Sequence, residues 1–357
     1  MDIGLIGGGG ISETHARAAL AIPGVRLAAV HGLREDRVRR LCEAWGGTPF
    51  TDLDAFLAHR PMDLVIVGSP SGLHAEHGAA AARHRLHVLV EKPIDITLDR
   101  VDALIGAADA AGVVLGACFQ DRFKPGVVRL KALVDQGTLG RVLTIEGRMP
   151  WYRPPSYYAD SRWRGTRALD GGGALMNQGI HTVDLLLWLG GAVTAVQART
   201  ATLLHAIEVE DTASAVLEFA SGALGTVFAT TAAYPGWPRR ITVTGTEGAA
   251  TIEGDDLVSA VVRSGEAIAG VEVTDAGTPA ASVSPAASAS PAASASPIVN
   301  DPGPHRAVIE DFLAAIRDGR PPRCDGRDAR RSVALIRAIY DASAASARVL
   351  VDQGCQE

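Results

Sequence analysis

A run of four glycines near the start of the chain constrains the fold more than any other feature. The run, Gly7–Gly10, follows the short apolar segment 3–6 and precedes the segment 13–21, which is compatible with a helix. A glycine turn between a strand and a helix is the setting in which a Gly-x-Gly-x-x-Gly pattern indicates a dinucleotide site. The sequence therefore predicts an α/β fold that opens with a nucleotide-binding turn.

The residues of this turn have distinct expected roles. Gly7 would make the tight turn, and Gly9 would let the backbone approach a pyrophosphate. Ser12 would take the close-packing place usually held by glycine or alanine. The phosphates would lie on the helix N-terminus beside Gly10 and Ile11, where free N–H groups and the helix dipole favour anions.

The alternation of apolar segments and helical runs continues as far as residue 121. It predicts a Rossmann domain over residues 1–121, with a doubly wound parallel sheet. The strands expected after the first are 26–30, 63–67, 88–90 and 113–118. Such sheets bind ligands at the carboxyl ends of their strands, so the residues that follow each strand are candidates for a cofactor site.

The end of the second strand bears on the choice of cofactor. NAD-binding folds usually place Asp or Glu here, on the adenosine ribose. Gly32 stands at this position, and Arg34 and Arg37 follow it. These arginines would either meet the 2′-phosphate of NADP or simply solvate the next helix. The expected cofactor is therefore NAD or NADP, with the preference open.

The third and fourth strands end in residues suited to the nicotinamide side. Ser69 and Pro70 follow the third strand, where the backbone could lie against a ribose. His74 begins the next helix and would either pack beside the nicotinamide or be an ordinary helix-start residue. The fourth strand ends in Glu91, Lys92 and a proline that stops the ladder, because proline has no N–H. Lys92 is therefore expected at the carboxyl end of a strand.

Residues 122–357 are predicted to form a second, α/β domain for substrate binding and oligomerisation. An amphipathic helix is expected over 127–136, and alternating segments separated by glycine-rich turns predict a large open sheet that is mostly antiparallel. Helices would cover one face, leaving the other for a homodimer or homotetramer. The expected strands are 142–149, 193–201, 212–219, 225–231, 240–244 and 250–253.

A polar stripe on an apolar helix lies between these strands. From Ala174 the pattern is helical, and Asn177, His181 and Asp184 are spaced to lie roughly along one face. The glycines 171–173 precede the helix, and several aromatic residues lie upstream. Polar groups in such surroundings indicate a pocket or buried hydrogen-bond partners.

The C-terminal third contains a low-complexity segment, 273–304, with a Pro/Ala/Ser repeat that is expected to be a disordered loop. Two helices, 306–317 and 327–347, are predicted after it. His305 and Asp325 could be ligands, but solvated helix caps are the favoured interpretation, and no metal is expected.

Composition excludes several classes of protein. A net charge of −6 argues against nucleic-acid and acidic-membrane partners. Four cysteines without a Cys-x-x-Cys pair indicate reduced thiols. Neither a signal peptide nor a membrane-length apolar stretch is evident. The expectation is a cytoplasmic protein that acts on a small molecule.

Taken together, the motifs resemble the Gfo/Idh/MocA family of nicotinamide-dependent sugar oxidoreductases, over nearly the whole chain. The matching pieces are the glycine turn, the turn 69–74, the Glu91-Lys92-Pro93 run and the glycine-rich helix that carries His181. The resemblance implies a Rossmann domain followed by an α/β domain whose open sheet supports dimers or tetramers. It also implies that Lys92 and His181 are catalytic.

The chain departs from the family pattern in two places. Asn177 stands where family members often have Asp, which would leave proton transfer to His181. The Pro/Ala/Ser repeat is foreign to the pattern and looks like a loop insertion. The run from Trp163 to His181 is closest to members that oxidise the C3 hydroxyl of nucleotide-linked sugars or amino sugars, a class that includes aminoglycosides.

The predicted reaction oxidises a secondary hydroxyl of a pyranose or cyclitol to a ketone, with hydride transfer to nicotinamide. His181 would be the general base, since an imidazole operates near neutral pH. Lys92 would stabilise the developing oxyanion. Glu91 would orient Lys92, and Asp184 would support the helix or tune His181.

The expected binding residues follow from these roles, since aromatic faces suit sugar C–H groups and arginines suit oxygens. The cofactor contacts would be Gly7, Gly9, Gly10, Ile11, Arg34, Ser69, Pro70, His74, Glu91, Lys92, Gln120, Trp163 and Arg164. The substrate contacts would be Lys92, Tyr152, Arg153, Tyr158, Asn177 and His181, with Trp163 and Arg164 also candidates. Two alternatives are an NADPH-dependent ketosugar reductase and a non-catalytic dinucleotide-binding sensor; the presence of both Lys92 and His181 disfavours the sensor.

Overall fold

The computed structural model describes residues 1–263 and 301–354, and the chain divides into two units. The first unit comprises Met1–Gln120, Thr166–Gly171 and Ile298–Val333. The second unit comprises Asp121–Gly165, Gly172–Pro297 and Ala334–Glu357. Nearly all of the low-complexity segment predicted from the sequence lies outside the described residues.

The first unit is built on a six-stranded sheet in the order β3-β2-β1-β4-β5-β6, and every pair in it is parallel. All four residues of β4 are buried, because helices cover both faces of a doubly wound sheet. The strands are β1 (Asp2–Ile6), β2 (Arg26–His31), β3 (Thr48–Phe50), β4 (Leu64–Val67), β5 (His87–Val90) and β6 (Leu115–Ala117). The sequence did not predict β3, which has only three residues and a central proline.

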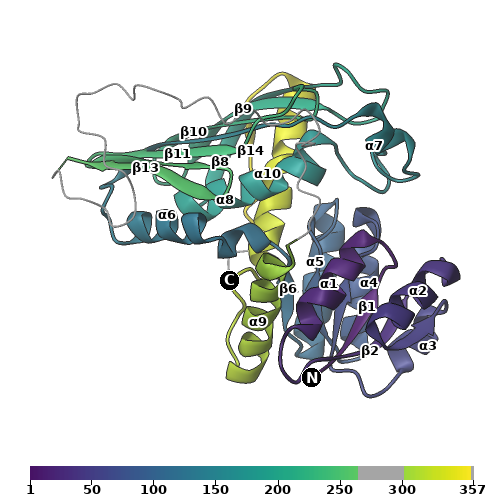
Figure 1. The fold of residues 1–357 in the computed structure, drawn as a ribbon. Coiled ribbons are helices and arrows are strands. Elements are labelled where there is room, and N and C mark those ends of the chain that lie inside the picture. Colours follow the sequence, from purple (N-terminus) through teal and green to yellow (C-terminus); the bar gives the residue numbers. More distant parts are fainter. Residues whose placement is uncertain (264–300, 355–357) are drawn as a thin grey trace. The chain divides into compact units, whose positions relative to one another are not determined.

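Five helices pack around this sheet (Figure 1). They are α1 (Gly10–Leu20), α2 (Glu35–Trp45), α3 (Leu53–Ala58), α4 (His74–Arg83) and α5 (Leu98–Ala111), and short 3₁₀ turns occupy Ser71–Leu73 and Gln120–Phe123. The chain runs outward from β1 through β2 to β3, then returns to β4 beside β1. This reversal creates a switch point between β1 and β4, where open α/β sheets bind ligands.

Helix α9 (Gly303–Asp318) and the start of α10 (Gly326–Ala345) belong to the first unit, which differs from the predicted boundary at residue 121. Phe312 is buried against Gly116 of β6, where a Cβ would lie 2.8 Å from its ring. The Ala117 N–H donates to the Cys324 carbonyl over 3.1 Å. An apolar helix face can be recognised in the sequence, but not the sheet on which it packs.

The favoured interpretation of His305 as a solvated cap is wrong. His305 is 2% exposed, because α9 packs against α1, and its ring lies 5.3 Å from that of His15. Asp325 does cap a helix, since its Oδ1 accepts the N–H of Asp328 in the first turn of α10 over 2.8 Å. Within the described residues, Cys42, Cys118 and Cys324 are free thiols.

The second unit is built on an eight-stranded sheet in the order β13-β12-β11-β7-β10-β9-β8-β14, as predicted mostly antiparallel. Among the described strand pairs of this second sheet, only the neighbours β7 and β10 run parallel. The strands are β7 (Val142–Pro150), β8 (Val193–Ala201), β9 (Thr212–Phe219), β10 (Leu224–Thr230), β11 (Arg240–Gly245), β12 (Gly248–Glu253), β13 (Asp256–Val262) and β14 (Val349–Leu350). The sequence did not predict β13 and β14.

Helices α6 (Pro125–Asp135) and α8 (Ile180–Gly190) lie on one face of this sheet (Figure 1). Helix α8 approaches closely at Gly147, where a Cβ would lie 2.8 Å from the Thr182 methyl group. A short helix α7 (Pro155–Ala159) and a π-helix over Ala174–Gly179 complete the unit. Among the described helices, none is both long and apolar enough to span a bilayer.

A buried ion pair fastens α8 to the start of the second unit. The Arg122 guanidinium donates to both carboxylate oxygens of Asp184 over 2.9 and 2.7 Å, and both side chains are almost fully buried. The guanidinium also lies 5.6 Å from the centre of the Trp188 ring. Asp184 therefore supports the helix, which is one of the two roles predicted for it.

We expect Asp184→Asn to lower the free energy of unfolding of the second unit by about 3–5 kcal/mol, because Arg122 would remain buried without its carboxylate. Guanidinium denaturation followed by circular dichroism would measure the change. The matched control is Glu218→Gln, which removes the exposed Arg348–Glu218 pair of the same unit and should leave the midpoint nearly unchanged. Equal midpoints for wild type and Asp184→Asn would contradict this account.

Candidate active site

The glycine turn has the backbone geometry that a nucleotide-binding loop requires. Gly7 has φ of +130°, and a Cβ there would lie 2.5 Å from the Gly68 carbonyl oxygen. The Gly7 N–H donates to the His31 carbonyl over 2.8 Å, which ties the turn to the end of β2. The Ile11 side chain packs against Gly68 as well, since its Cγ2 would lie 3.3 Å from a Cβ at Gly68. Only glycine fits at position 7.

The surface over the start of α1 is open. A Cβ at Gly9 or Gly10 would have no described heavy atom within 4 Å, and Gly9 is the N-cap of the helix. The Ser12 hydroxyl beneath is buried and has no hydrogen-bond partner among the described residues. Free N–H groups at a helix start, with room above them, fit the pyrophosphate of a dinucleotide.

The Arg34 guanidinium, predicted to contact a 2′-phosphate, already pairs with a carboxylate of the protein. Its guanidinium donates to both carboxylate oxygens of Asp36 over 3.0 and 3.1 Å, and both side chains are exposed. At Gly32 a Cβ would lie 3.0 Å from the Val38 methyl group, so a larger residue would crowd α2. A 2′-phosphate at this position would have to displace Asp36 from Arg34.

His74 joins two of the loops that follow strands. Its ring is buried, with Nδ1 2.6 Å from the Pro93 carbonyl and Nε2 2.7 Å from the Ser69 carbonyl. Both ring nitrogens are thus engaged by backbone, and His74 holds the Ser69–Pro70 turn against the end of β5. His77 lies 2.9 Å from the Ser69 hydroxyl, and burial, assisted by nearby His31, lowers the pKa of His77 to about 4.

Glu91 and Lys92 continue from the end of β5. The Glu91 N–H donates to the Val67 carbonyl over 2.8 Å, and Glu91 Oε2 accepts the Lys92 N–H over 3.1 Å. Glu91 Oε1 lies 2.7 Å from His15 Nε2. Burial raises the pKa of Glu91, but the His15 hydrogen bond and the charges of His15, His305 and Lys92 outweigh it, so the pKa lies well below its ordinary value. An ionised Glu91 therefore precedes the half-buried Lys92.

Gln120 follows β6, the next strand in the sheet. Its Oε1 is buried and has no hydrogen-bond partner among the described residues. Ser69, Lys92 and Gln120 follow β4, β5 and β6, so they lie along one edge of the sheet. An open phosphate cradle and an unsatisfied acceptor at the strand ends fit a nicotinamide dinucleotide.

In the second unit, the predicted polar helix begins as a π-helix over Ala174–Gly179 and continues as α8. No side chain fits at Gly173, where a Cβ would lie 1.8 Å from the Glu210 carbonyl oxygen. The Glu210 carboxylate accepts the N–H groups of Gly173 and Leu175 over 3.0 and 2.8 Å, and the Tyr340 hydroxyl over 2.9 Å. Burial, opposed by these hydrogen bonds, raises the pKa of Glu210. The sequence analysis missed Glu210 as a capping acid. Its position shortly before β9 was the one feature of the sequence that could have pointed to it.

The wide π turn alters the predicted polar stripe. Asn177 is partly exposed and accepts a hydrogen bond from Gln178 over 3.2 Å, whereas Asp184 is fully buried with Arg122. His181 is 8% exposed, and it interacts electrostatically with the Asp121 carboxylate. Burial raises the pKa of Asp121, but the charges of Arg239, His181 and Lys124 together bring it well below its ordinary value.

Asp121 is thus a carboxylate that interacts with His181 and that the sequence did not indicate. It forms ion pairs with Arg239 and, over 2.8 Å, with Lys124. The signal for it was weak, because Asp121 lies 60 residues before His181 and follows a different strand. A fixed carboxylate beside a buried imidazole favours the imidazolium that forms when the ring accepts a proton.

Two arginines lie close to the ring of one tyrosine in the aromatic segment. Arg153 lies 4.6 Å and Arg164 4.4 Å from the centre of the Tyr157 ring. Arg153 Nη2 donates to Gln178 Oε1 over 2.6 Å, and Gln178 Nε2 donates to the Tyr157 hydroxyl over 2.8 Å. Among the described residues, no carboxylate pairs with either guanidinium, and both Nε atoms are buried without a hydrogen-bond partner. Burial, with the like charge of Arg164, lowers the pKa of Arg153.

The other predicted binding residues have more varied environments. Tyr158 is buried, and its hydroxyl lies 2.9 Å from the Thr231 hydroxyl, so it supports the segment from within. Tyr152 stacks edge-on against the exposed Tyr234 at 5.2 Å. The Arg164 guanidinium lies 5.5 Å from the centre of the Trp163 ring. Tyr157 and Gln178, which the sequence analysis did not select, connect the two arginines to the π-helix.

Known proteins resemble both units of the chain. Residues 1–119 match the oxidoreductase family with the NAD-binding Rossmann fold, and residues 127–251 match the Gfo/Idh/MocA C-terminal domain. Myo-inositol 2-dehydrogenase from Thermotoga maritima is 32% identical, over 70% of this chain and 74% of that protein.

Two solved structures resemble the whole chain. The WlbA dehydrogenase from Bordetella pertussis, in complex with NADH and UDP-GlcNAcA, is 30% identical with a TM-score of 0.85, over 98% of each chain. GenD2 from gentamicin A biosynthesis, in complex with NAD, is 28% identical with a TM-score of 0.80, over 99% of this chain and 96% of that one. The matches confirm the predicted fold, the oxidoreductase class and the nicotinamide cofactor. The chain belongs to the Gfo/Idh/MocA family of oxidoreductases.

Proposed function

We propose that this protein is an NAD(P)-dependent dehydrogenase that oxidises a secondary hydroxyl, at C3, of a sugar that carries an anionic group. The main evidence for an anionic substrate is the pair Arg153 and Arg164. Both guanidinium groups lie close to the ring of one tyrosine, and neither has a carboxylate partner among the described residues. Guanidinium forks match carboxylate and phosphate oxygens. A cationic amino sugar would be repelled there.

The catalytic roles proposed for His181 and Lys92 follow from charge. A neutral alcohol is a poor hydride donor and an incipient alkoxide a good one, so a base must take the hydroxyl proton. His181 is the proposed base, and the ionised Asp121 nearby stabilises its protonated form. Lys92 is the proposed cation for the developing oxyanion. The nicotinamide, when bound, accepts the hydride.

The first support for an acidic substrate comes from the relatives. WlbA was solved with UDP-GlcNAcA, a nucleotide-linked sugar whose diphosphate and carboxylate are anionic. The second support is the rigidity of the arginine cluster. Gln178 holds Arg153 from the π-helix, and both guanidinium groups lie within 4.6 Å of the centre of the Tyr157 ring, so the cluster is ordered before any ligand arrives.

The catalytic roles predict that Lys92→Ala and His181→Ala each lower kcat by about 10²–10⁴-fold while NAD(H) binding persists. Absorbance of reduced nicotinamide, followed in both directions, measures turnover, and titration calorimetry measures cofactor binding. The controls Lys131→Ala and His84→Ala change side chains outside the candidate site. Wild-type turnover in either catalytic variant would refute the role of that residue.

The substrate class predicts that Arg153→Ala and Arg164→Ala raise KM for the acidic sugar about 10- to 100-fold, as expected for a lost charge-assisted hydrogen bond of about 1.5–3 kcal/mol. The panel is UDP-GlcNAcA, UDP-GlcNAc, myo-inositol and an aminoglycoside. A KM rise for both nucleotide sugars assigns the arginines to phosphate, and a rise for the uronic acid alone assigns them to carboxylate. The control Arg162→Ala removes an exposed charge of the same segment. Turnover best on the aminoglycoside, unchanged in both variants, would refute the anionic class.

We also propose that the uncovered face of the eight-stranded sheet mediates a homodimer or homotetramer. Val216 of β9 is 48% exposed and Leu224 of β10 is 55% exposed, although both lie in strands of a well-packed sheet. Val216→Lys should reduce the mass measured by light scattering after gel filtration, whereas the exposed-helix control Arg39→Ala should not. A monomeric wild-type protein would refute the association.

A further inference from the structure

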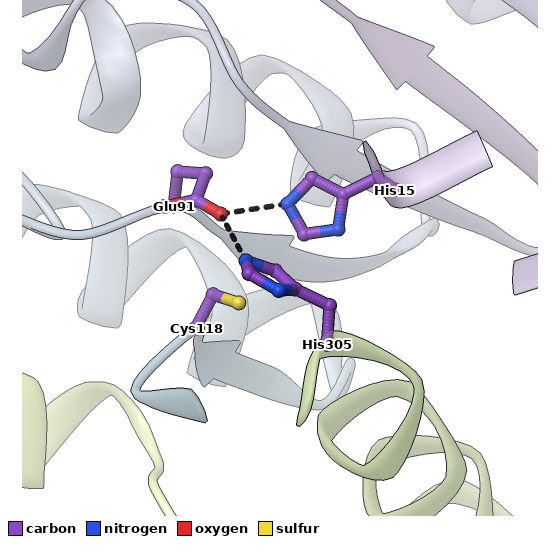
Figure 2. Close-up of side chains that lie close together, drawn as sticks. All are labelled: His15, Glu91, Cys118 and His305. Carbon is purple, nitrogen blue, oxygen red and sulfur yellow. Dashed lines mark hydrogen bonds and ion pairs between the residues drawn. The ribbon is translucent and has the colours of Figure 1, made fainter. Parts of the chain in front are cut away.

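We propose that the first unit binds a zinc-type transition-metal ion at His15, Glu91, Cys118 and His305. The four side chains are all buried, and one ligand atom from each lies within 4.8 Å of the others. His15 Nε2 lies 2.7 Å and His305 Nε2 3.8 Å from Glu91 Oε1. Figure 2 shows both imidazole rings directed at the carboxylate, with the Cys118 thiol beside them.

The four ligands come from different parts of the first unit. His15 lies on α1, Glu91 follows β5, Cys118 follows β6 and His305 lies on α9. Their separation in the sequence explains why no metal motif was apparent there. A metal ion at this point would fasten the C-terminal segment to the Rossmann sheet, as structural zinc sites do for other small units.

The donor set selects the kind of metal. A thiolate and two imidazoles are soft or borderline ligands, which suit zinc and cobalt, whereas magnesium and calcium require oxygen ligands. Tetrahedral zinc with bonds of about 2.0–2.3 Å places neighbouring ligand atoms about 3.3–3.8 Å apart. The four ligand atoms lie within 4.8 Å of one another, so shifts of about 1 Å at these atoms would bring the separations into this range. Four protein ligands in a buried position correspond to a closed structural site rather than a catalytic one.

The balance of charge also fits. A divalent ion with the Glu91 carboxylate, the Cys118 thiolate and two neutral imidazoles has no net charge, so its burial carries no uncompensated ion. Without metal, the carboxylate depends instead on the His15 hydrogen bond and on neighbouring positive charge, that of Lys92 included. Glu91 Oε2 accepts the Lys92 N–H over 3.1 Å, and Oε1 and His15 Nε2, which are 2.7 Å apart, would exchange their mutual hydrogen bond for bonds to the ion. The site would therefore also hold the backbone of Lys92 in place.

The experiment uses the full-length protein purified without a histidine tag. Elemental analysis by mass spectrometry measures zinc per chain, and a chromophoric competitor measures affinity. Cobalt reconstitution tests the ligand set, because tetrahedral Co²⁺ bound to a thiolate gives intense visible d–d bands and a sulfur charge-transfer band. We expect a single ion per chain, the charge-transfer band, and a rise in melting temperature when zinc is added to chelator-treated protein.

The variants Cys118→Ser and His305→Gln should weaken zinc binding by more than about 100-fold. Changing a residue that only hydrogen-bonds to a metal ligand typically weakens binding by about 10- to 100-fold, so a larger loss indicates direct ligands. The Cys118→Ser variant should also abolish the charge-transfer band. The controls Cys42→Ser and His84→Gln replace a thiol and an imidazole elsewhere in the first unit and should bind zinc like the wild type. Circular dichroism shows whether each variant is folded.

Two outcomes would overturn the proposal. The first is native protein that gives no cobalt–thiolate band and no zinc-dependent melting shift, which would leave a hydrogen-bonded cluster without a metal ion. The second is zinc that binds equally well to the Cys118→Ser and His305→Gln variants, which would place the ion elsewhere. Neither measurement requires a substrate, so the result does not depend on the proposed dehydrogenase activity.

Discussion

The carboxylate of Glu91 is buried in the first unit, and an ionised carboxylate without a partner in such a position costs several kcal/mol. Its location is set by the backbone, because the Glu91 N–H extends the ladder to the Val67 carbonyl and thereby also places Lys92. Its neighbours His15 on α1 and His305 on α9 lie 2.7 and 3.8 Å from Glu91 Oε1, and Lys92 adds positive charge. One buried charge therefore links the nucleotide-binding helix, the proposed oxyanion-stabilising lysine and the C-terminal segment of the first unit.

In the second unit, contacts between Glu210 and the backbone at the start of the π-helix fix the position of the arginine cluster. Gly173 has no room for a side chain against the Glu210 carbonyl, and the Glu210 carboxylate binds two N–H groups at the start of the π-helix. Because this start is fixed, the wide turn that follows directs Gln178 toward Arg153 and Tyr157. An irregular helix is costly unless its surroundings hold it, and such turns recur at functional sites. The arginine cluster thus depends on a capping acid in another part of the unit.

The features that could be predicted from the sequence depend on residues that lie close together in the chain. The glycine turn was predictable because strand, turn and helix follow within a few residues, and because Gly7 needs a positive φ. The strands β3 and β14 escaped notice because three and two residues cannot show a period. His305 was misassigned and Asp121 was missed for a different reason: their neighbours are distant in sequence. Hydrophobic periodicity identifies a buried face, but it does not identify the partner of that face.

The two polar clusters differ in how their charge is balanced, and this difference bears on function. The Glu91 cluster contains its own compensation, whether neighbouring positive charge or a metal ion supplies it, so it can be complete within the protein. Arg153 and Arg164 lie on the same tyrosine with like charges, and burial lowers the pKa of Arg153. Such an arrangement is unfavourable by itself, and local conflicts of this kind are retained mainly where a ligand resolves them. This conflict is the ground for our proposal that the substrate brings an anion, since no carboxylate among the described residues pairs with either guanidinium.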